Sequence, residues 1–210
     1  MNKRGLFVTF EGGEGAGKTT LIKKLVQEIL SRGLSVLTTR EPGGTSLGEE
    51  IRNLLLHRQE SEAPLSPYSE LALFLASRSQ HIREVIRPAL LAQKIVLCDR
   101  FNDSSIAYQG LGRGLGMKQV QEVCHFMSEG LEPDLTFYLD LEPELGMKRA
   151  KERQTADRIE SEQMSFHQKI REAYQEIHRE NPRRFHLIDA TATPATVFAK
   201  TMEVLGSHLG

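Results

Sequence analysis

The stretch that decides the fold is Gly12-Gly13-Glu14-Gly15-Ala16-Gly17-Lys18-Thr19, which has the pattern G-x-x-x-x-G-K-T. The apolar run Leu6–Phe10 comes shortly before it. Apolar residues at helical spacing come after it, namely Leu21, Ile22, Leu25, Val26, Ile29 and Leu30. A buried strand, a glycine-rich loop and a helix in this order are the context that a phosphate-binding loop (P-loop) requires.

The chemistry of this loop indicates nucleotide binding. Its glycines let backbone N–H groups converge on phosphate oxygens without a side-chain clash. The N-terminus of the following helix adds unpaired N–H donors and the positive end of a dipole. We expect the Lys18 ammonium to reach the β- and γ-phosphates of the nucleotide and the Thr19 hydroxyl to ligate Mg²⁺.

The composition is that of an ordinary globular protein. A chain of 210 residues is most simply a single domain. Its 27 basic and 28 acidic side chains give a net charge of −1, so we expect no general attraction to nucleic acid or to an anionic membrane. No apolar run approaches the ~20 residues of a membrane span. Cys98 and Cys124 fit no metal-binding spacing, and unpaired cysteines favour the reducing cytoplasm.

Five short apolar runs alternate with helical patterns along the chain. They are Leu6–Phe10, Ser35–Thr39, Lys94–Asp99, Leu135–Leu141 and Phe185–Asp189. This alternation predicts an α/β fold with a five-stranded parallel sheet and helices on both faces. Ligands of such folds bind at the carboxyl ends of the strands, so the residues that follow each run are the candidates for function.

Helical patterns occupy most of the remaining chain. One runs from Tyr68 to about Ala92, and we expect Pro88 to kink it or to split it in two. The glycine-rich stretch Gly110–Gly116 is expected to be a mobile connector. The other predicted helices are Leu47–His57, Met117–Glu129, a short helix from Glu142-Pro143-Glu144 to about Glu152, Ser161–Glu180 and a closing helix that begins at Thr193-Pro194.

Charged residues follow the second apolar run. Arg40 and Glu41 stand at its carboxyl end, and Pro-Gly-Gly then marks a rigid turn, which is either a plain connector or part of a site. Arg52 lies beside the apolar face of the next helix, where it is placed to swing toward an anion. Such an arginine is also ordinary on a protein surface.

Phe74 and Arg78 are four residues apart in a predicted helix and therefore share one face. An aromatic ring beside a guanidinium suits a planar base, because the ring stacks on the base and the guanidinium donates to a carbonyl oxygen. The alternative is that Phe74 belongs to the hydrophobic core.

Polar and charged side chains are dense at positions 99–109, at the end of the third apolar run. Asp99 is placed to hold Mg²⁺ through water or to accept a proton. Arg100 is placed to grip a phosphate with two parallel hydrogen bonds. The alternative is an ion-paired loop that leads into the next helix through a serine cap.

A basic segment at 148–158 lacks an apolar stripe at its end, so we expect it to be exposed and movable. It is either a solvated charged face or a lid that brings cations to a transferring phosphoryl group. The lid is favoured because the variable P-loop positions hold no arginine, while phosphoryl transfer needs positive charge at the equatorial oxygens. The nearest candidates are Arg149, Arg153 and Arg158.

Three stretches of the sequence resemble the thymidylate kinase family in its bacterial form. They are L-C-D-R-F-x-x-S-S-x-A-Y-Q at 97–109, the P-loop phrase Phe10–Thr20 and the turn Thr39–Thr45, so the resemblance spans nearly the whole chain. It implies a three-layer P-loop NTPase fold in a single kinase domain, 1–210, with a mobile helical lid at about 148–160. It also implies ATP-dependent phosphorylation of dTMP to dTDP for dTTP synthesis, with Mg²⁺, in a cytoplasmic homodimer.

The resemblance implies which residues bind dTMP. Phe74 matches the ring that stacks on thymine, Arg78 the arginine that hydrogen-bonds to its O4, and Tyr108 the ring that lies against C2′ and disfavours a ribose hydroxyl. The matching contacts to the other parts of dTMP are Glu14 to the sugar 3′-OH, Arg52 and Arg100 to the phosphate, and Ser105 and Gln109 to the base. Glu41 and Ser104 complete the expected dTMP set.

The resemblance also implies the residues that bind ATP and those that act in catalysis. Arg153 matches the lid arginine of family members whose P-loop lacks one, and Asp99 matches an acid assigned to Mg²⁺ or to orienting the reaction. The expected ATP set is Gly12, Gly13, Glu14, Gly15, Ala16, Gly17, Lys18, Thr19, Thr20, Arg149 and Arg153. The expected catalytic set is Lys18, Arg153, Arg100, Asp99 and Glu14, and the expected metal ligands are Thr19 and Asp99.

Three alternatives stay open at this point. One is a kinase for another nucleotide or for a nucleoside, which the 99–109 stretch disfavours. Another is a nucleotide-dependent switch, but the chain has no Asn-Lys-x-Asp guanine motif and its Asp99-Arg100 strand end is not D-x-x-G. The third is a purely structural dimer that uses no nucleotide.

Overall fold

The computed structural model describes residues 4–57, 63–151 and 158–209. They form a five-stranded sheet in the order β2-β3-β1-β4-β5, and every pairing in it is parallel. The strands are β1 (Phe7–Glu11), β2 (Val36–Arg40), β3 (Ile95–Asp99), β4 (Leu135–Asp140) and β5 (Phe185–Asp189). The predicted sheet is therefore confirmed, and each strand boundary lies within one residue of its expected place.

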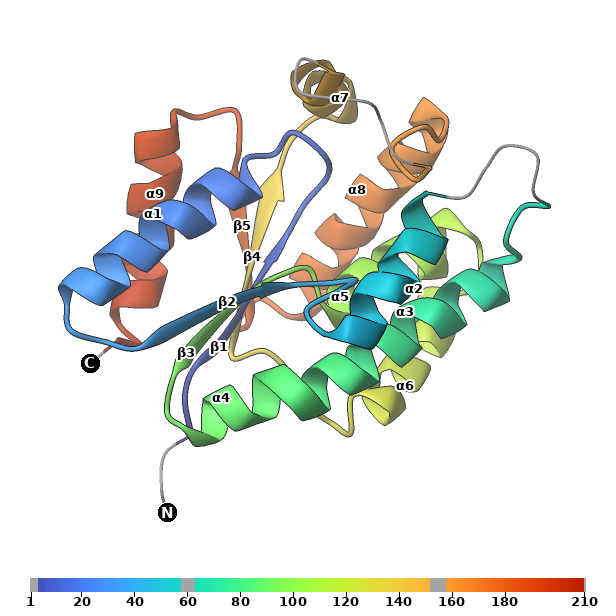
Figure 1. Cartoon of the computed structure of the whole chain (residues 1–210). Helices are drawn as coiled ribbons and strands as arrows, with labels where there is room; N and C mark the ends of the chain where they lie inside the picture. The colour runs from blue at the N-terminus through green and yellow to red at the C-terminus, as the bar shows by residue number, and fades with distance from the viewer. Residues whose placement is uncertain (1–3, 58–62, 152–157, 210) are drawn as a thin grey trace.

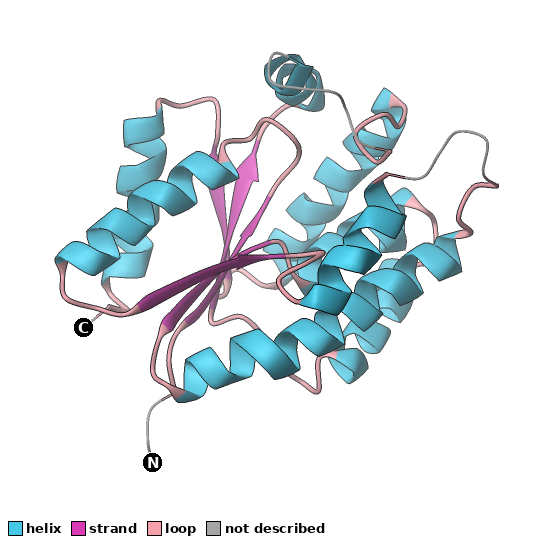
Figure 2. Ribbon diagram, in the orientation of Figure 1, coloured by secondary structure: helices cyan, strands magenta, loops and turns pink. Residues whose placement is uncertain are grey.

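Helices connect the strands in the alternation that the sequence predicts (Figure 2). None of the helices in the described parts of the chain has the length and apolar character needed to cross a bilayer. The helices are α1 (Lys18–Ser31), α2 (Ser46–Leu56), α3 (Pro67–His81), the π-helix η1 (Ile82–Ile86), α4 (Arg87–Leu91), α5 (Asn102–Ser105), the π-helix η2 (Ile106–Gly112), α6 (Met117–Met127), α7 (Pro143–Lys151), α8 (Met164–Glu180) and α9 (Pro194–Gly206).

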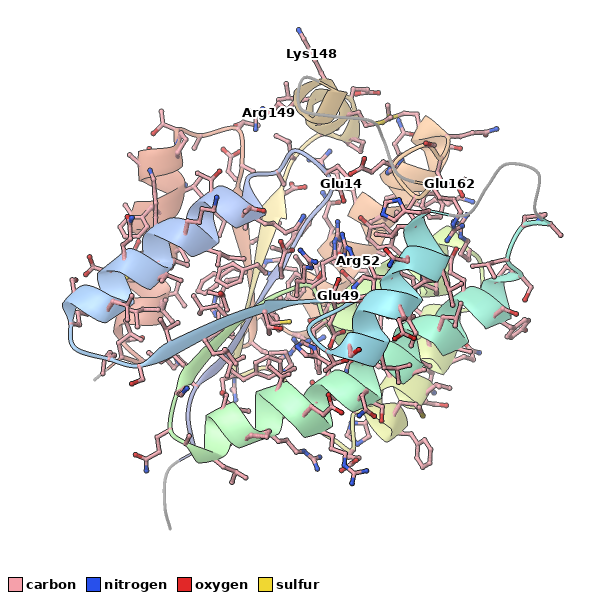
Figure 3. All side chains as sticks on the ribbon, viewed as in Figure 1. Glu14, Glu49, Arg52, Lys148, Arg149 and Glu162 are labelled. Carbon is pink, nitrogen blue, oxygen red and sulfur yellow. The ribbon has the colours of Figure 1, made fainter. Side chains whose placement is uncertain are left out.

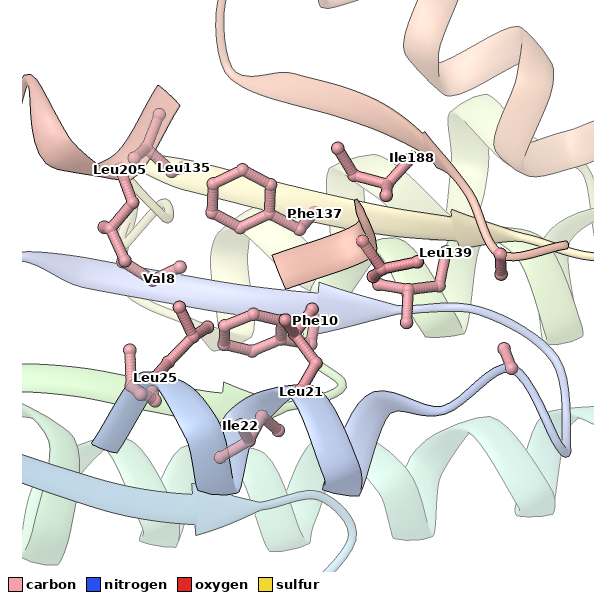
Figure 4. Close-up of a cluster of buried hydrophobic side chains, with 14 of the residues drawn as sticks. Val8, Phe10, Leu21, Ile22, Leu25, Leu135, Phe137, Leu139, Ile188 and Leu205 are labelled. Atoms are coloured by element: carbon pink, nitrogen blue, oxygen red, sulfur yellow. The ribbon is translucent and has the colours of Figure 1, made fainter. Parts of the chain in front are cut away.

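Successive side chains of a strand point to opposite faces of the sheet, and both faces are buried here. Val8 and Phe10 of β1 pack with α1 and α9 on one face (Figure 4). Phe7 of β1 packs with η1 and α4 on the other face, and the helices α3, α6 and α8 cover the rest of that face around Tyr138 and Phe185. Figure 1 shows the resulting three layers, with α1 and α9 on one side of the sheet.

The strand order positions the site. β1 lies in the centre of the sheet, between β3 and β4. The chain leaves β1 toward β2 on one side and later returns to β4 on the other side, so the strand order reverses at β1. A crevice forms at such a point because the connections from neighbouring strands diverge. The P-loop follows β1 directly and therefore lies at this crevice.

The long helix around Pro88 is not split in two. α3, η1 and α4 follow one another without a gap, from Pro67 to Leu91. The turn ahead of Pro88 is π-helical, with the Arg87 N–H bonded to the Ile82 carbonyl five residues earlier. A proline ring clashes with the carbonyl four residues before it in a regular α-helix. The wider turn accommodates that ring, so the helical path continues.

In two further places the local structure differs from the expectation. The glycine-rich stretch begins inside η2, where Gly110 is buried. A Cβ at this position would lie only 3.0 Å from Met117 Cα at the start of α6. Gly110 therefore serves close packing and is not part of a loose connector. The helix expected from Ser161 begins at Met164, since 158–161 form a turn instead.

Candidate active site

The P-loop is held in shape by its own backbone and by α7. Gly15 has φ +68°, and a Cβ on it would lie 2.2 Å from the Gly146 carbonyl oxygen of α7. Glycine is therefore required at position 15 both by its left-handed backbone and by the close approach of α7. The Lys18 ammonium donates to the carbonyl oxygens of Gly12 (3.0 Å) and Gly13 (3.2 Å), which keeps it at the loop.

A cavity of about 240 Å³ opens beside the P-loop, at the carboxyl edge of the sheet. Glu14 enters it from the P-loop and Arg52 from α2 (Figure 3). The cavity brings together every residue of the expected dTMP set, namely Glu14, Glu41, Arg52, Phe74, Arg78, Arg100, Ser104, Ser105, Tyr108 and Gln109. These residues come from the P-loop, the turn after β2, α2, α3 and the segment after β3, and only the folded sheet makes them neighbours.

Arg100 is the central cation of this cavity. Its backbone has φ +74°, an unusual value for a residue with a side chain and one that often marks a functional position. Its guanidinium donates to Glu14 Oε1 (2.5 Å) and to Ser104 Oγ (3.3 Å) and lies 5.0 Å from the centre of the Tyr108 ring. Burial raises the pKa of Glu14, but the charges of Arg100 and Lys18 outweigh it and lower that pKa to about 2. Both partners are therefore charged at neutral pH.

Arg78 is buried at the far wall of the cavity, with 1% of its side chain exposed. Its Nε donates to Glu41 Oε2 (2.6 Å), one Nη donates to Ser105 Oγ (3.0 Å) and the other to the Phe101 carbonyl (3.1 Å). Burial lowers the pKa of Arg78, but Glu41 outweighs it and the net pKa is raised. The other carboxylate oxygen of Glu41 lies 3.0 Å from His81 Nδ1, so both oxygens of Glu41 are engaged with protein groups.

Phe74 lies on the cavity wall and also contacts the core. It is partly buried and packs on Leu55 and Leu56 of α2, while its ring lines the cavity. Arg52, one turn before Leu55 on α2, donates to the Pro42 carbonyl (3.0 Å). Phe74 is thus neither a purely buried core residue nor a free surface ring.

Glu11 is a buried acid at the site to which the sequence analysis assigned no role. Its carboxylate accepts hydrogen bonds from the Phe101 N–H (2.8 Å), the Ser104 hydroxyl (2.5 Å) and the Tyr174 hydroxyl (2.8 Å). It therefore joins the end of β1 to the start of α5 and to α8. The one available signal was an acid directly after an apolar strand, which is equally typical of an exposed strand end.

The titration of Glu11 reflects its surroundings. Burial and the neighbouring Asp103 raise its pKa to about 7, although the hydroxyl donors and Arg100 act in the opposite direction. A buried carboxyl ionises with difficulty because the charged form loses its hydration. The Ser104 hydroxyl donates its hydrogen to this acid, so Glu11 determines where the Ser104 side chain lies.

Asp99 and Thr19 line the same cavity on the P-loop side. Asp99 Oδ1 is buried and accepts no hydrogen bond in the part of the chain that the structure describes. An unpartnered carboxylate oxygen and a hydroxyl in one cavity are oxygen ligands of the kind that Mg²⁺ prefers. The same described residues contain no group of three or more His, Cys, Asp and Glu side chains that could hold a metal ion by themselves. A cation here would therefore complete its coordination with phosphate or water oxygens.

The basic segment is divided between two places. Arg149 of α7 donates to the Ala190 carbonyl (3.2 Å) and lines a second cavity of about 230 Å³, between the P-loop, α1 and the start of α9 (Figure 3). Arg158 instead donates to Glu70 of α3 and to the Leu55 carbonyl of α2. Arg153 and the rest of 152–157 lie outside the described residues.

The family model described as thymidylate kinase matches residues 10–200. The chain belongs to the thymidylate kinase family. A thymidylate kinase of Protochlamydia amoebophila is 47% identical over 209 residues, covering 96% of this chain and 92% of the relative. One from Acinetobacter baylyi is 47% identical over 198 residues, covering 94% and 97%.

A solved structure gives the same result. The crystal structure of thymidylate kinase from Ehrlichia chaffeensis matches with a TM-score of 0.77 at 34% identity, covering 96% of this chain and 99% of that one. The expected three-layer P-loop fold and the resemblance to thymidylate kinases are thereby confirmed. A switch or a kinase for another nucleotide is not favoured for a thymidylate kinase of this kind.

The raised pKa of Glu11 makes a testable contribution to stability. In the unfolded chain this acid ionises near 4.5, but in the folded chain it keeps its proton until about pH 7. The free energy of unfolding therefore falls as the pH rises between these values, by on the order of 3 kcal/mol. We expect Glu11→Gln, which cannot ionise, to lack this loss.

Urea unfolding of wild type and Glu11→Gln at a series of pH values from 5 to 8 measures the effect. As the pH rises, the unfolding free energy of Glu11→Gln should increase relative to that of the wild type. Glu172→Gln, at an exposed carboxyl on α8, is the control and should follow the wild type. Parallel pH curves for wild type and Glu11→Gln would show that Glu11 is not the titrating group.

Proposed function

We propose that the 240 Å³ cavity binds dTMP and that the P-loop beside it binds ATP with Mg²⁺. The reaction, ATP-dependent phosphorylation of dTMP to dTDP, is that of the thymidylate kinase family to which the chain belongs. The observation that carries the proposal is that one cavity joins the P-loop to the whole expected acceptor set. Donor and acceptor phosphates would then meet in one crevice.

The acceptor is held at three points. Arg100 and Arg52 bind its phosphate, since both guanidiniums line the cavity near the P-loop. Phe74 stacks on the base, while Arg78 and Gln109 read its edge and Glu41 and Ser105 hold Arg78 in place. Glu14 binds the sugar 3′-OH, and the buried Tyr108 ring leaves no room for a 2′-OH.

The donor is held by the P-loop from Gly12 to Thr20. Its backbone amides and the Lys18 ammonium bind the phosphates. The second cavity, which reaches from the P-loop to Ala190 and Pro194, takes the nucleoside end of ATP, with Arg149 at its edge. This arrangement is supported by the continuity of both cavities with residues Gly15–Gly17 and Thr20 of the loop.

The phosphoryl group moves in line from donor to acceptor, without a covalent intermediate on the enzyme. Little covalent chemistry is needed from the protein in such a transfer, so catalysis is positioning and charge neutralisation. Lys18 and Arg153 neutralise the transferring group, and Arg100 aligns the attacking phosphate. A lid at about 148–160, within a single domain, excludes water from the reaction.

Mg²⁺ would be held by Thr19 and Asp99. The unpartnered Asp99 Oδ1 supports this assignment. Held there, Mg²⁺ would neutralise part of the charge on the donor phosphates.

The protein acts as a homodimer in the cytoplasm. α6, which packs beside α3, exposes 42% of Val123 and 78% of Phe126, an apolar surface suited to a second copy of the chain. Both cysteines are free and buried, as is usual in a reducing compartment.

The function is tested with a panel of acceptors. We expect ATP-dependent ADP release to be fastest with dTMP and slower with dUMP, since one methyl group is worth roughly a 10- to 200-fold preference. Thymidine, which lacks the phosphate, should give no more than background. A coupled assay of ADP release measures this. Equal rates with dCMP or thymidine would refute dTMP as the substrate, and ADP release independent of any acceptor would indicate a hydrolase.

Phe74→Ala is expected to weaken dTMP binding by roughly tenfold to a hundredfold, because stacking on the base is lost. The KM for ATP should stay nearly unchanged. Leu71→Ala, a buried core position on the same helix, is the control and should lower stability without changing the KM for dTMP. Steady-state kinetics and thermal unfolding measure both variants. If the KM values for ATP and dTMP rise together, Phe74 acts as a core residue only.

Asp99→Asn is expected to raise the Mg²⁺ concentration for half-maximal activity by about tenfold or more, because a charged ligand is lost. The dissociation constant of dTMP measured without metal should change little. Asp134→Asn, at the opposite edge of the sheet, is the control. A Mg²⁺ titration of the rate measures the effect. An unchanged Mg²⁺ requirement would remove Asp99 from the metal site.

A further inference from the structure

Glu70 of α3 is a buried acid behind the base-binding end of the cavity, with a relative exposure of 1%. Its Oε1 accepts from Gln109 Nε2 (2.9 Å) and from Arg113 Nε (3.0 Å). Its Oε2 accepts from Arg113 Nη2 (3.2 Å) and from Arg158 Nη2 (2.6 Å). Two arginines thus hold the acid, and the acid in turn holds Gln109.

Glu70 is a carboxylate at neutral pH. Burial raises its pKa, but the hydrogen bonds and charges of Arg113, Gln109 and Arg158 outweigh burial and lower the pKa below its usual range. An ionised carboxylate accepts hydrogen bonds and donates none. Glu70 can therefore face only the NH₂ end of a neighbouring amide.

This fixes the orientation of Gln109. An amide has a donor end and an acceptor end that exchange places when the group turns over. With Nε2 bonded to Glu70, Oε1 is the end left for the cavity that Gln109 lines. Oε1 accepts no hydrogen bond from the residues that the structure describes. Turning the amide over would set Gln109 Oε1 against Glu70 Oε1, two acceptors with no hydrogen between them.

Arg78 offers the opposite polarity at the same end of the cavity. Hydrogen bonds to Glu41, Ser105, Cys124 and Phe101 use four of its five N–H donors within the described chain. The remaining N–H and Gln109 Oε1 form a donor and an acceptor for one ligand. Thymine and uracil match this pair, because O4 accepts and N3–H donates. Cytosine has the reverse pattern, since its 4-amino group donates and its N3 accepts.

We propose that Glu70 is a specificity-determining residue that fixes the Gln109 amide and thereby makes the site select a pyrimidine dione over cytosine. The proposal rests on the proposed function, because it takes the cavity to hold the base of the acceptor. Glu70 acts on the base only through Gln109 and is not itself a substrate ligand. Discrimination of this kind comes from a repulsive contact with the wrong base as well as an attractive one with the right base.

Glu70→Gln tests the proposal, because a glutamine can pair with either end of the Gln109 amide. The readout is the ratio of the dissociation constants of dCMP and dTMP, with dTMP measured by direct titration and dCMP by competition. We expect this ratio to fall by about tenfold or more, mainly through tighter dCMP binding. If Glu70 had a purely structural role, Glu70→Gln would weaken the binding of dCMP and dTMP alike and leave the ratio unchanged.

Glu162→Gln is the matched control. Glu162 stands just before α8 (Figure 3) and accepts from Arg113 (2.6 Å), as Glu70 does, but it has no hydrogen bond with Gln109 in the described structure. Its substitution removes a comparable ion pair, so we expect the dCMP-to-dTMP ratio of the wild type. An equal fall of the ratio in both variants would overturn the proposal, because Arg113 would then be the cause.

A second variant covers the case in which Glu70→Gln does not fold. Gln109→Ala removes the fixed acceptor, so the ratio should again fall; an unchanged ratio in Gln109→Ala overturns the proposal. The wild type separates this inference from the proposed function. If wild type does not prefer dTMP over dCMP, the proposed function itself fails. If wild type prefers dTMP and folded Glu70→Gln keeps the same ratio, only the role of Glu70 fails.

Discussion

Pairing between buried or partly buried arginines and carboxylates shapes the cavity beside the P-loop. Arg100 is bonded to Glu14, Arg78 to Glu41, and Arg113 and Arg158 to Glu70. A site for an anionic acceptor needs guanidiniums inside the protein, where an unpaired charge is very costly. The carboxylates offset that cost and fix the direction of each guanidinium. A phosphate can therefore be gripped with little reorganisation of the protein, which is the condition for efficient transfer.

The P-loop is likewise fixed in place by its neighbours. Its tip has no space between Gly15 and Gly146, so the start of α7 rests directly on the loop. Arg171 of α8 bonds to Asp140 at the end of β4 and to Glu142 ahead of α7. α7 is thus fixed at its first turn by β4, α8 and the loop.

The fold and the residues that line the cavity could be predicted from the sequence, but the hydrogen bonds between those residues could not. Local patterns were sufficient for the strands, for the P-loop and for Phe74 with Arg78, which share a helix face. The partners of Arg78 and of Gln109 are a glutamate 37 positions away and one 39 positions away, and no periodicity encodes such distances. Glu11 was overlooked because a strand-end acid has the same local pattern whether it is buried or exposed. The π-helical turns were missed for a similar reason, since their wider path depends on packing against neighbouring elements.

Glu11 and Glu70 show how the surroundings of two glutamates near one cavity move their pKa values in opposite directions. Both are buried acids with relative exposures of 0% and 1%. Burial and the neighbouring Asp103 raise the pKa of Glu11 to about 7, because its neutral donors, the Phe101 N–H and two hydroxyls, and the charge of Arg100 offset burial only in part. Glu70 faces two guanidiniums, and its pKa falls. Glu70, which accepts a hydrogen bond from Gln109, thus keeps its charge over the pH range in which Glu11 titrates. A change of pH near neutrality would therefore act on the turn that carries Arg100, which Glu11 holds through the Phe101 N–H, and would leave the hydrogen bond between Glu70 and Gln109 intact.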